Sequence, residues 1–151
     1  MSDDVIFSRA ASVAERIVGL MESCSESVDA ALYRLNNPRL TEALVESRQR
    51  GVPIRLLVDG GKYEEDSATR RLLAEGRVPF KLTHGRSGQS SKMHHKFAIL
   101  DRRTVLTGSY NWTRESEEQN YEHMVVLRDP EHVRAYQEEF EALWKEAEFC
   151  V

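Results

Sequence analysis

The sequence predicts a single-domain α/β protein in which helices flank both faces of a mixed β-sheet. Short apolar runs alternate with amphipathic segments through the first half of the chain, which is typical of parallel strands joined by helices. In the second half, the apolar runs 93–100 and 104–109 are separated by only three residues, which indicates an antiparallel hairpin in the same sheet. At 151 residues with 40% hydrophobic side chains, the chain can form one core. We therefore treat residues 1–151 as one domain.

The first elements are expected to alternate between strand and helix. Residues 4–8 form a short apolar run and residues 27–35 contain β-branched and aromatic side chains, so both are expected as strands. Between them, residues 10–24 carry apolar side chains at helical spacing. Residues 38–51 begin with proline and end at glycine, as helices do. Residues 53–59 form an apolar run bounded by proline and a glycine pair, which favours a buried strand.

The remaining elements lead to the hairpin and beyond it. Residues 84–92 are small, polar and glycine-containing, so a loop is expected there. Residues 131–147 form an amphipathic run that is long enough for a closing helix. A further helix is expected over 66–76, and further strands are expected over 78–83, 93–100, 104–109 and 121–127.

Composition argues against several classes of protein. Apolar runs such as 97–100 are only a few residues long, so no segment is expected to span a bilayer. The first residues are acidic and lack the basic and then apolar pattern of a signal peptide. Cys24 and Cys150 stand far apart, so neither a disulfide framework nor a zinc site is expected. We expect a reducing, cytoplasmic location without stable membrane association.

The charges are unevenly distributed along the chain. The formal net charge of −4 argues weakly against a general nucleic-acid binder. Between Lys81 and Arg103, however, there are six basic residues and one acid, Asp101. A solvated charged face would explain such a run on its own. Here the run also contains the adjacent histidines His94 and His95, and this coincidence favours a functional site.

The spacing of His94 and Lys96 favours phosphate chemistry. Side chains alternate between the faces of a strand, so these two point the same way, while His95 and Asp101 point the other way. A fixed ammonium beside a neutral imidazole repels metal ions. It suits a phosphate, because the lysine holds nonbridging oxygens while the imidazole attacks or protonates. A core histidine and a surface lysine would explain the pair if it stood alone.

Further polar residues follow the hairpin. Gly108 permits a close backbone approach, and Ser109 and Asn111 are two residues apart, so both side chains can face one site. Glu122 begins a later strand, where a carboxylate could orient an imidazole through its second nitrogen. A polar turn and a solvated acid would explain these residues individually. Their combination with His94 favours a shared site.

Together, these residues resemble the His-Lys-Asp signature of the phospholipase D superfamily. The pattern is His94-x-Lys96-x4-Asp101-x6-Gly108-Ser109-x-Asn111, and residues 48–59 look like a strand entry common in these proteins. The motif is similar to that of the single-motif branch of the superfamily. This branch includes bacterial Nuc-type endonucleases and mitochondrial phospholipase D (Zucchini) endoribonucleases. The membrane anchor and cysteine-rich insertion of the latter have no counterpart here. A mitochondrial-surface role is therefore not expected.

The resemblance implies a phospholipase D-like sandwich and a metal-independent phosphodiesterase without a cofactor. His94 would form a covalent phosphohistidine, Lys96 and Asn111 would bind phosphate oxygens, and Ser109 would support them. An acid at the position of Glu122 hydrogen-bonds the nucleophilic histidine in the family. Asp101 completes the motif, and its strand parity indicates a structural role. The candidate catalytic residues are therefore His94, Lys96, Ser109, Asn111, Glu122 and Asp101.

In-line displacement at phosphorus needs a second acid opposite the nucleophile. His95 is expected to point to the other side of its strand from His94, and His123 to face away from Glu122. His132 is expected in the terminal helix, whereas His84 in the loop could approach the phosphate. A second copy of His94 across a two-fold axis is the simpler solution. The resemblance implies the same, so we expect a homodimer with one composite site.

The expected substrate is single-stranded nucleic acid, cleaved by an endonuclease reaction. The basic segment would follow the substrate backbone. Tyr110 and Trp112 could stack bases, although a core role is favoured. A cardiolipin-like phospholipid is the alternative substrate. A non-catalytic interaction module is disfavoured, because such domains typically lose the nucleophile or the lysine. The candidate substrate-binding residues are Arg86, Lys92, Arg102 and Arg103.

Overall fold

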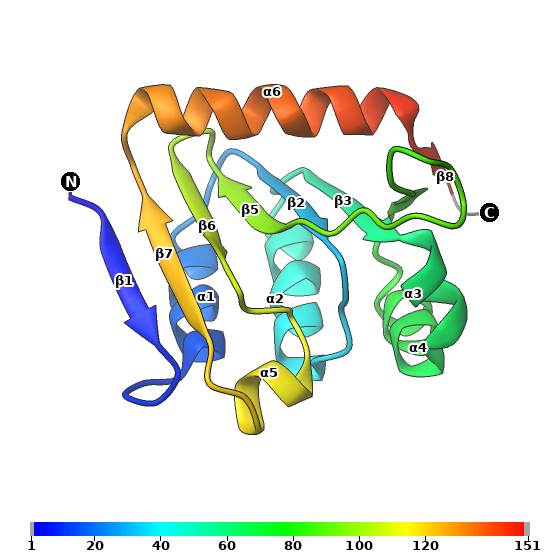
Figure 1. Cartoon of the computed structure of the whole chain (residues 1–151). Coiled ribbons are helices and arrows are strands. Elements are labelled where there is room, and N and C mark those ends of the chain that lie inside the picture. The colour runs from blue at the N-terminus through cyan, green and yellow to red at the C-terminus, as the bar shows by residue number, and fades with distance from the viewer. Residues whose placement is uncertain (1, 150–151) are drawn as a thin grey trace.

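A mixed β-sheet runs through the molecule, and helices cover both of its faces (Figure 1). The computed structural model describes residues 2–149, so Cys150 lies outside the described residues. The strands are β1 (Asp4–Phe7), β2 (Val28–Leu32), β3 (Ile54–Asp59), β4 (Lys81–Thr83), β5 (Lys96–Leu100), β6 (Thr104–Gly108), β7 (His123–Leu127) and β8 (Glu148–Phe149). The helices are α1 (Val13–Glu22), α2 (Pro38–Gln49), α3 (Gly60–Glu65), α4 (Ser67–Gly76), α5 (Arg114–Glu118) and α6 (Pro130–Glu146).

Within the described residues, the sheet has eight strands in the order β1-β7-β6-β5-β2-β3-β4-β8. Strands β2, β3 and β4 pair in parallel, and the other neighbours pair antiparallel. The predicted hairpin is β5–β6, and the prediction of a mixed sheet is confirmed. At one end of the sheet, the carboxyl ends of β2, β3 and β6 lie beside the amino ends of β5 and β7. We call this end of the sheet the His94 end.

The two faces of the sheet bury separate cores. On one face, α1, α2 and α4 pack through side chains such as Ile17, Leu44 and Leu73. On the other face, α6 packs through Val133 and Phe140 (Figure 1). Strand β2 is buried on both faces along its whole length, as expected for a central strand.

The helices begin where the sequence provides capping side chains. Ser12 accepts a hydrogen bond from the N–H of Glu15 at the start of α1. Asn37 and Asp129 cap α2 and α6, each followed by the proline that favours a first turn. Within residues 2–149, no helix combines the length and the apolar character needed to cross a bilayer.

Several boundaries differ from the sequence-based prediction. The strand predicted over 93–100 begins only at Lys96, and α5 and β8 were not predicted. Helix α3 was also not predicted, because its first two residues are glycines, which usually end elements. Asp59 offsets this preference, since its carboxylate accepts a hydrogen bond from the N–H of Lys62 and caps the helix.

Candidate active site

His94 and Lys96 lie together at the His94 end of the sheet. Lys96 is the first residue of β5. Its Nζ lies 3.2 Å from Nδ1 of His94 and donates to the His94 carbonyl oxygen at 2.8 Å. The imidazole packs against the ring of Tyr33, with 4.4 Å between the ring centroids. The two side chains therefore form one unit, as their spacing predicted.

The surroundings of His94 favour its neutral form. Partial burial lowers the pKa of the imidazole below its usual value, and the ammonium groups of Lys96 and Lys92 lower it further. The carboxylate of Asp59 acts in the opposite direction. An imidazole that is neutral near pH 7 has a free lone pair, which a nucleophile needs.

The carboxylate of Glu122 lies at the centre of a hydrogen-bonded cluster. Ser109 Oγ donates to Oε1 at 2.6 Å, and Ser116 Oγ donates to Oε2 at 2.9 Å. Asn120 Nδ2 also donates to Oε2 at 3.1 Å. Three donors hold this carboxylate in one orientation, and the hydrogen bond from Ser109 is the shortest of the three.

Gly108 allows the strands that carry this cluster to approach each other. A Cβ at this position would lie 2.4 Å from the carbonyl oxygen of His123 in β7, which is too close for any other residue. The N–H of Ser109 donates to the same oxygen, and the N–H of His123 donates back to Ser109 Oγ at 3.1 Å. The glycine therefore positions Ser109 beside Glu122.

The expected contact between Glu122 and His94 is not formed in this structure. Within residues 2–149 no hydrogen bond joins them, because both carboxylate oxygens of Glu122 are engaged and Nδ1 of His94 faces Lys96. Glu122 still acts on the site through its charge. Burial lowers the pKa of Lys96, and the Glu122 carboxylate partly opposes this effect.

Asn111 is connected to the cluster through the backbone. Its N–H donates to Ser116 Oγ, and its side-chain Oδ1 is buried without a hydrogen-bond partner among the described residues. The neighbouring Tyr110 and Trp112 are each 2% exposed and belong to the core, as favoured from the sequence. They are therefore not exposed to stack bases.

His95 contacts a different set of residues from His94. Its Nε2 lies 2.9 Å from a carboxylate oxygen of Glu139 on α6, and its ring packs against Phe97. The opposite orientation of the two histidines agrees with the prediction from strand parity. Both nevertheless border one open cavity of about 380 Å³, to which α6 contributes Tyr136 and Glu139.

Asp101 has a structural role at the opposite end of β5. Its Oδ1 accepts hydrogen bonds from the thiol of Cys24 and from the N–H groups of three consecutive residues, Ser25, Glu26 and Ser27. Burial would raise its pKa, but these hydrogen bonds outweigh burial and lower it. Burial and the adjacent Asp101 carboxylate raise the pKa of Cys24 to about 12. Asp101 therefore holds the 24–27 turn and does not border the His94 cavity.

The four predicted substrate-binding cations are divided between the two ends of the sheet. Lys92 is close enough to His94 to affect its pKa, and Arg86 is exposed in the loop beyond it. Arg102 and Arg103 lie in the β5–β6 turn, on the far side of a five-residue strand, about 16 Å long. The structure does not bring these two arginines to the cavity of His94. The strand predicted over 93–100 already separates His94 from this turn, so the grouping of all four cations in one substrate-binding surface was wrong for these two.

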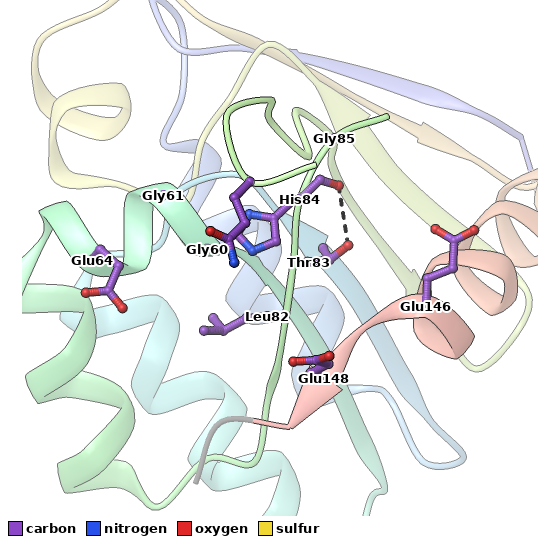
Figure 2. A pocket seen from close by; sticks show the side chains of 10 residues that line it. Gly60, Gly61, Glu64, Leu82, Thr83, His84, Gly85, Glu146 and Glu148 are labelled. Carbon is purple, nitrogen blue, oxygen red and sulfur yellow. Dashed lines mark hydrogen bonds between the residues drawn. The ribbon is translucent and has the colours of Figure 1, made fainter. Parts of the chain in front are cut away.

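His84, considered as a second acid, lies in a separate cavity of about 710 Å³ (Figure 2). Its ring lies against Gly60 at the start of α3, where a Cβ would be only 2.3 Å from the ring carbon Cε1. No residue that lines this cavity also lines the His94 cavity. His123 is exposed beside Phe7, and His132 is exposed in the first turn of α6. None of these three borders the His94 cavity.

Three residues near the site, Asp59, Tyr33 and Lys62, were not predicted from the sequence. Asp59 is 2% exposed, and its Oδ1 accepts a hydrogen bond from the N–H of Met93, directly before His94. Tyr33 follows β2 and provides the surface on which His94 packs, and Lys62 Nζ lies 5.6 Å from the same ring. Both Asp59 and Tyr33 stand at the carboxyl ends of parallel strands, where ligand sites commonly form. That position was the available signal.

The fold and the site define an α/β protein with a lysine-supported histidine and a serine-bound carboxylate at one end of a mixed sheet. The family model described as "Cardiolipin synthase, PLD-like domain" matches residues 17–144. The chain belongs to this family of the phospholipase D superfamily.

Individual relatives agree with this assignment. The chain is 32% identical over 135 residues to the human protein named mitochondrial cardiolipin hydrolase, covering 89% of this chain and 52% of that protein. The Xenopus tropicalis protein of the same name is 34% identical over 131 residues, covering 87% of this chain and 60% of that protein. The chain spans about half the length of the curated relatives it matches.

Two solved structures share the fold over almost the whole chain. One is Nuc from Salmonella typhimurium, a phospholipase D family member, with a TM-score of 0.87 and 24% identity over 99% of this chain and 97% of that chain. The other is NucT from Helicobacter pylori, with a TM-score of 0.87 and 20% identity over 99% of both chains. The predicted phospholipase D-like sandwich is confirmed.

Proposed function

We propose that the protein is a metal-independent phosphodiesterase that cleaves single-stranded nucleic acid through a covalent phosphohistidine on His94. The contact between Lys96 Nζ and His94 Nδ1 at 3.2 Å is the observation that carries this proposal. It joins a nucleophile to a fixed positive charge that can stabilise a phosphoryl group, so a metal ion is not needed for that task.

The proposed reaction has two displacement steps. Nε2 of His94 attacks phosphorus, a P–N bond forms, and the P–O bond to the leaving group breaks while an acid protonates the leaving oxygen. Water then attacks the phosphohistidine, the P–N bond breaks, and the same group takes the water proton. Lys96 moves from Nδ1 onto a phosphate oxygen when the substrate binds, which frees Nδ1 to carry the proton.

The acid in this proposal is His94 of the partner subunit. His95 is engaged with Glu139, and His84 lines a different cavity. A two-fold axis beside the cavity would place the two His94 side chains on opposite sides of one phosphate. Mixing wild-type chains with excess His94→Asn chains should therefore reduce activity more than simple dilution does. Full activity in a proven monomer would contradict the composite site.

Nucleic acid is favoured because exposed rings and a cation lie at the same end of the sheet as His94. Tyr121, directly before Glu122, is 86% exposed, and Phe7 is 58% exposed beside the ring of His123. Exposed aromatic rings near cations are typical of surfaces that stack the bases of single strands. Lys92 supplies a cation close enough to His94 to affect its pKa.

Phospholipid is the second candidate substrate, supported by the name of the curated relatives, mitochondrial cardiolipin hydrolase. One assay separates the two candidates. The protein is incubated in EDTA with single-stranded DNA, single-stranded RNA, duplex DNA or cardiolipin vesicles, with His94→Asn as the control. We expect cleavage of a single-stranded substrate by the wild type only. Turnover of cardiolipin alone would overturn the substrate, and cleavage only after addition of a divalent metal would overturn the mechanism. An intact wild type that cleaves nothing, with or without metal, would favour an interaction module.

A further inference from the structure

Four arginines gather at the end of the sheet opposite His94. Arg102 and Arg103 lie in the β5–β6 turn, Arg128 follows β7, and Arg134 lies on α6, and all four line one cavity of about 630 Å³. Figure 1 shows the β5–β6 turn and the start of α6 together at this end. We call this cavity the arginine pocket. Its volume is in the range of sites for small ligands, about 300–1,000 Å³.

The positive charge of the arginine pocket is only partly compensated, because the carboxylates that interact with Arg102 and Arg128 through their charges, Glu141 and Asp4, do not line the pocket. Among the described residues, neither Arg102 nor Arg134 forms an ion pair or a side-chain hydrogen bond. Arg103 is 3.9 Å from Glu26, and both side chains are mostly exposed, so this pair adds little. Arg128 donates to the carbonyl oxygen of Ser2, which leaves its charge in place. Four guanidinium groups around one cavity repel each other unless an anion lies between them.

The conformation of the turn adds to this arrangement. Asp101 and Arg102 both have positive φ, at 55° and 56°. The hydrogen bonds of Asp101 account for its conformation, but Arg102 occupies a position that normally favours glycine or asparagine. A long cationic side chain therefore stands at the lip of the pocket at some conformational cost.

The wall of the pocket also offers an apolar surface and the side chain of Gln137. Pro130 and Val133 contribute the apolar part. Gln137 donates through Nε2 to Asp29 and Glu141, at 2.9 and 3.0 Å, and these two bonds fix the orientation of its amide. Its Oε1 is buried without a hydrogen-bond partner among the described residues. A ligand that combines an anion with a flat or apolar body would match both the guanidinium groups and the apolar wall.

We propose that the arginine pocket binds a nucleotide, with its phosphate on the guanidinium groups and its base or sugar against Pro130, Val133 and Gln137. Guanidinium groups pair well with phosphate oxygens and stack on flat rings. A membrane surface fits less well, because the exposed large apolar side chains of the described residues, Val5, Phe7 and Tyr121, do not line this pocket. The nucleotide is either free or part of a bound strand. The site shares no residue with the His94 cavity and does not depend on the proposed reaction.

The test combines amide chemical-shift mapping with binding measurements at low salt. The probes are AMP, a single-stranded dodecanucleotide and cardiolipin vesicles. We expect AMP or the dodecanucleotide to shift the amides of residues 102–104 and 133–137 in the wild type. Shifts with AMP identify a free nucleotide, and shifts with the dodecanucleotide alone identify a strand.

Variants of the exposed arginines provide the second measurement. The double variant Arg102→Gln/Arg134→Gln should weaken binding at the pocket about tenfold or more. The charge-matched control Arg71→Gln/Arg77→Gln, on and after α4, should change it less than twofold. The proposal would be overturned if AMP and the dodecanucleotide saturate the wild type without shifts at the pocket. It would also be overturned if the two double variants weaken binding equally, or if only the vesicles bind in a way that depends on the arginines. Loss of cleavage in His94→Asn with unchanged shifts at the pocket would leave it standing.

Discussion

Nζ of Lys96 and Nδ1 of His94 lie 3.2 Å apart, so an ammonium and an imidazole share one small volume before any substrate is bound. The ammonium donates to Nδ1 in this arrangement, which requires an imidazole that is neutral and protonated on Nε2. Attack on phosphorus through Nε2 needs the other tautomer. In the proposed reaction, Lys96 therefore moves from Nδ1 to a phosphate oxygen when the substrate binds.

Lys96→Met should reduce cleavage by about 100-fold or more, because it removes the charge that stabilises the phosphoryl group. The same change should raise the pKa of His94, since the Lys96 ammonium contributes to its lowered value. Steady-state kinetics and NMR titration of the His94 ring measure the two effects. A large loss of activity with an unchanged pKa would mean that Lys96 does not act on His94 electrostatically.

Lys92→Gln should raise the pKa of His94 and shift the acid limb of kcat/KM to higher pH. In the wild type, burial and the two lysines lower this pKa below 6.5. The imidazole of His94 therefore stays largely neutral until the pH falls to its lowered pKa. Removing one ammonium makes protonation easier and leaves less neutral imidazole at a given acidic pH. The pH profiles of wild type, Lys92→Gln and the distant Arg71→Gln are compared. Coincident profiles for all three would contradict the electrostatic account.

Asp101→Ala should destabilise the fold by about 2 kcal/mol while leaving the specific activity of the folded protein nearly unchanged. The carboxylate accepts hydrogen bonds from three backbone N–H groups and one thiol, far from the His94 cavity. Its pKa is lower in the folded than in the unfolded chain, so its stabilisation is present above pH 3.8 and is lost as the pH falls through the folded value. Urea unfolding at pH 7 and at pH 3 measures both effects. Wild type and variant should differ clearly at pH 7, and the difference should be smaller at pH 3, below the unfolded pKa of 3.8.

His95→Asn should lower activity far less than His94→Asn. In this account His95 is a packing residue bonded to Glu139, and the acid comes from the second subunit. Glu139→Gln serves as the matched variant, because it weakens the same contact while leaving His95 in place. If His95→Asn is as inactive as His94→Asn while Glu139→Gln keeps most of the activity, the acid lies within one chain.

The sequence predicted the order of most strands and helices, because apolar periodicity and capping residues agree with the tertiary structure. It missed α3, where the Asp59 carboxylate caps two glycines that would otherwise end an element. It also missed α5, which is only five residues long and has a single buried side chain, Ser116. Both helices are short and begin at a capping side chain, Asp59 or Thr113, so they carry too few residues to show a helical apolar pattern.

Strand parity placed His94 with Lys96 and separated His95 from them, and the contacts in the structure agree with this. The predicted strand over 93–100 also places Arg102 and Arg103 at its far end from His94, and the error lay in treating the basic residues of 81–103 as one surface. Strand parity could not show that Ser109 and Ser116 occupy the carboxylate of Glu122, since this requires the close approach of β6 and β7 at Gly108.

The most direct test of the central claim is the capture of the covalent intermediate. The protein is mixed with a single-stranded substrate in EDTA, quenched within the first turnover, digested at alkaline pH and analysed by mass spectrometry. We predict an adduct of the retained strand fragment, joined through its terminal phosphate to the peptide that contains His94, present in the wild type and absent from His94→Asn. Rapid cleavage without any adduct on His94, or with an adduct on another residue, would contradict the account.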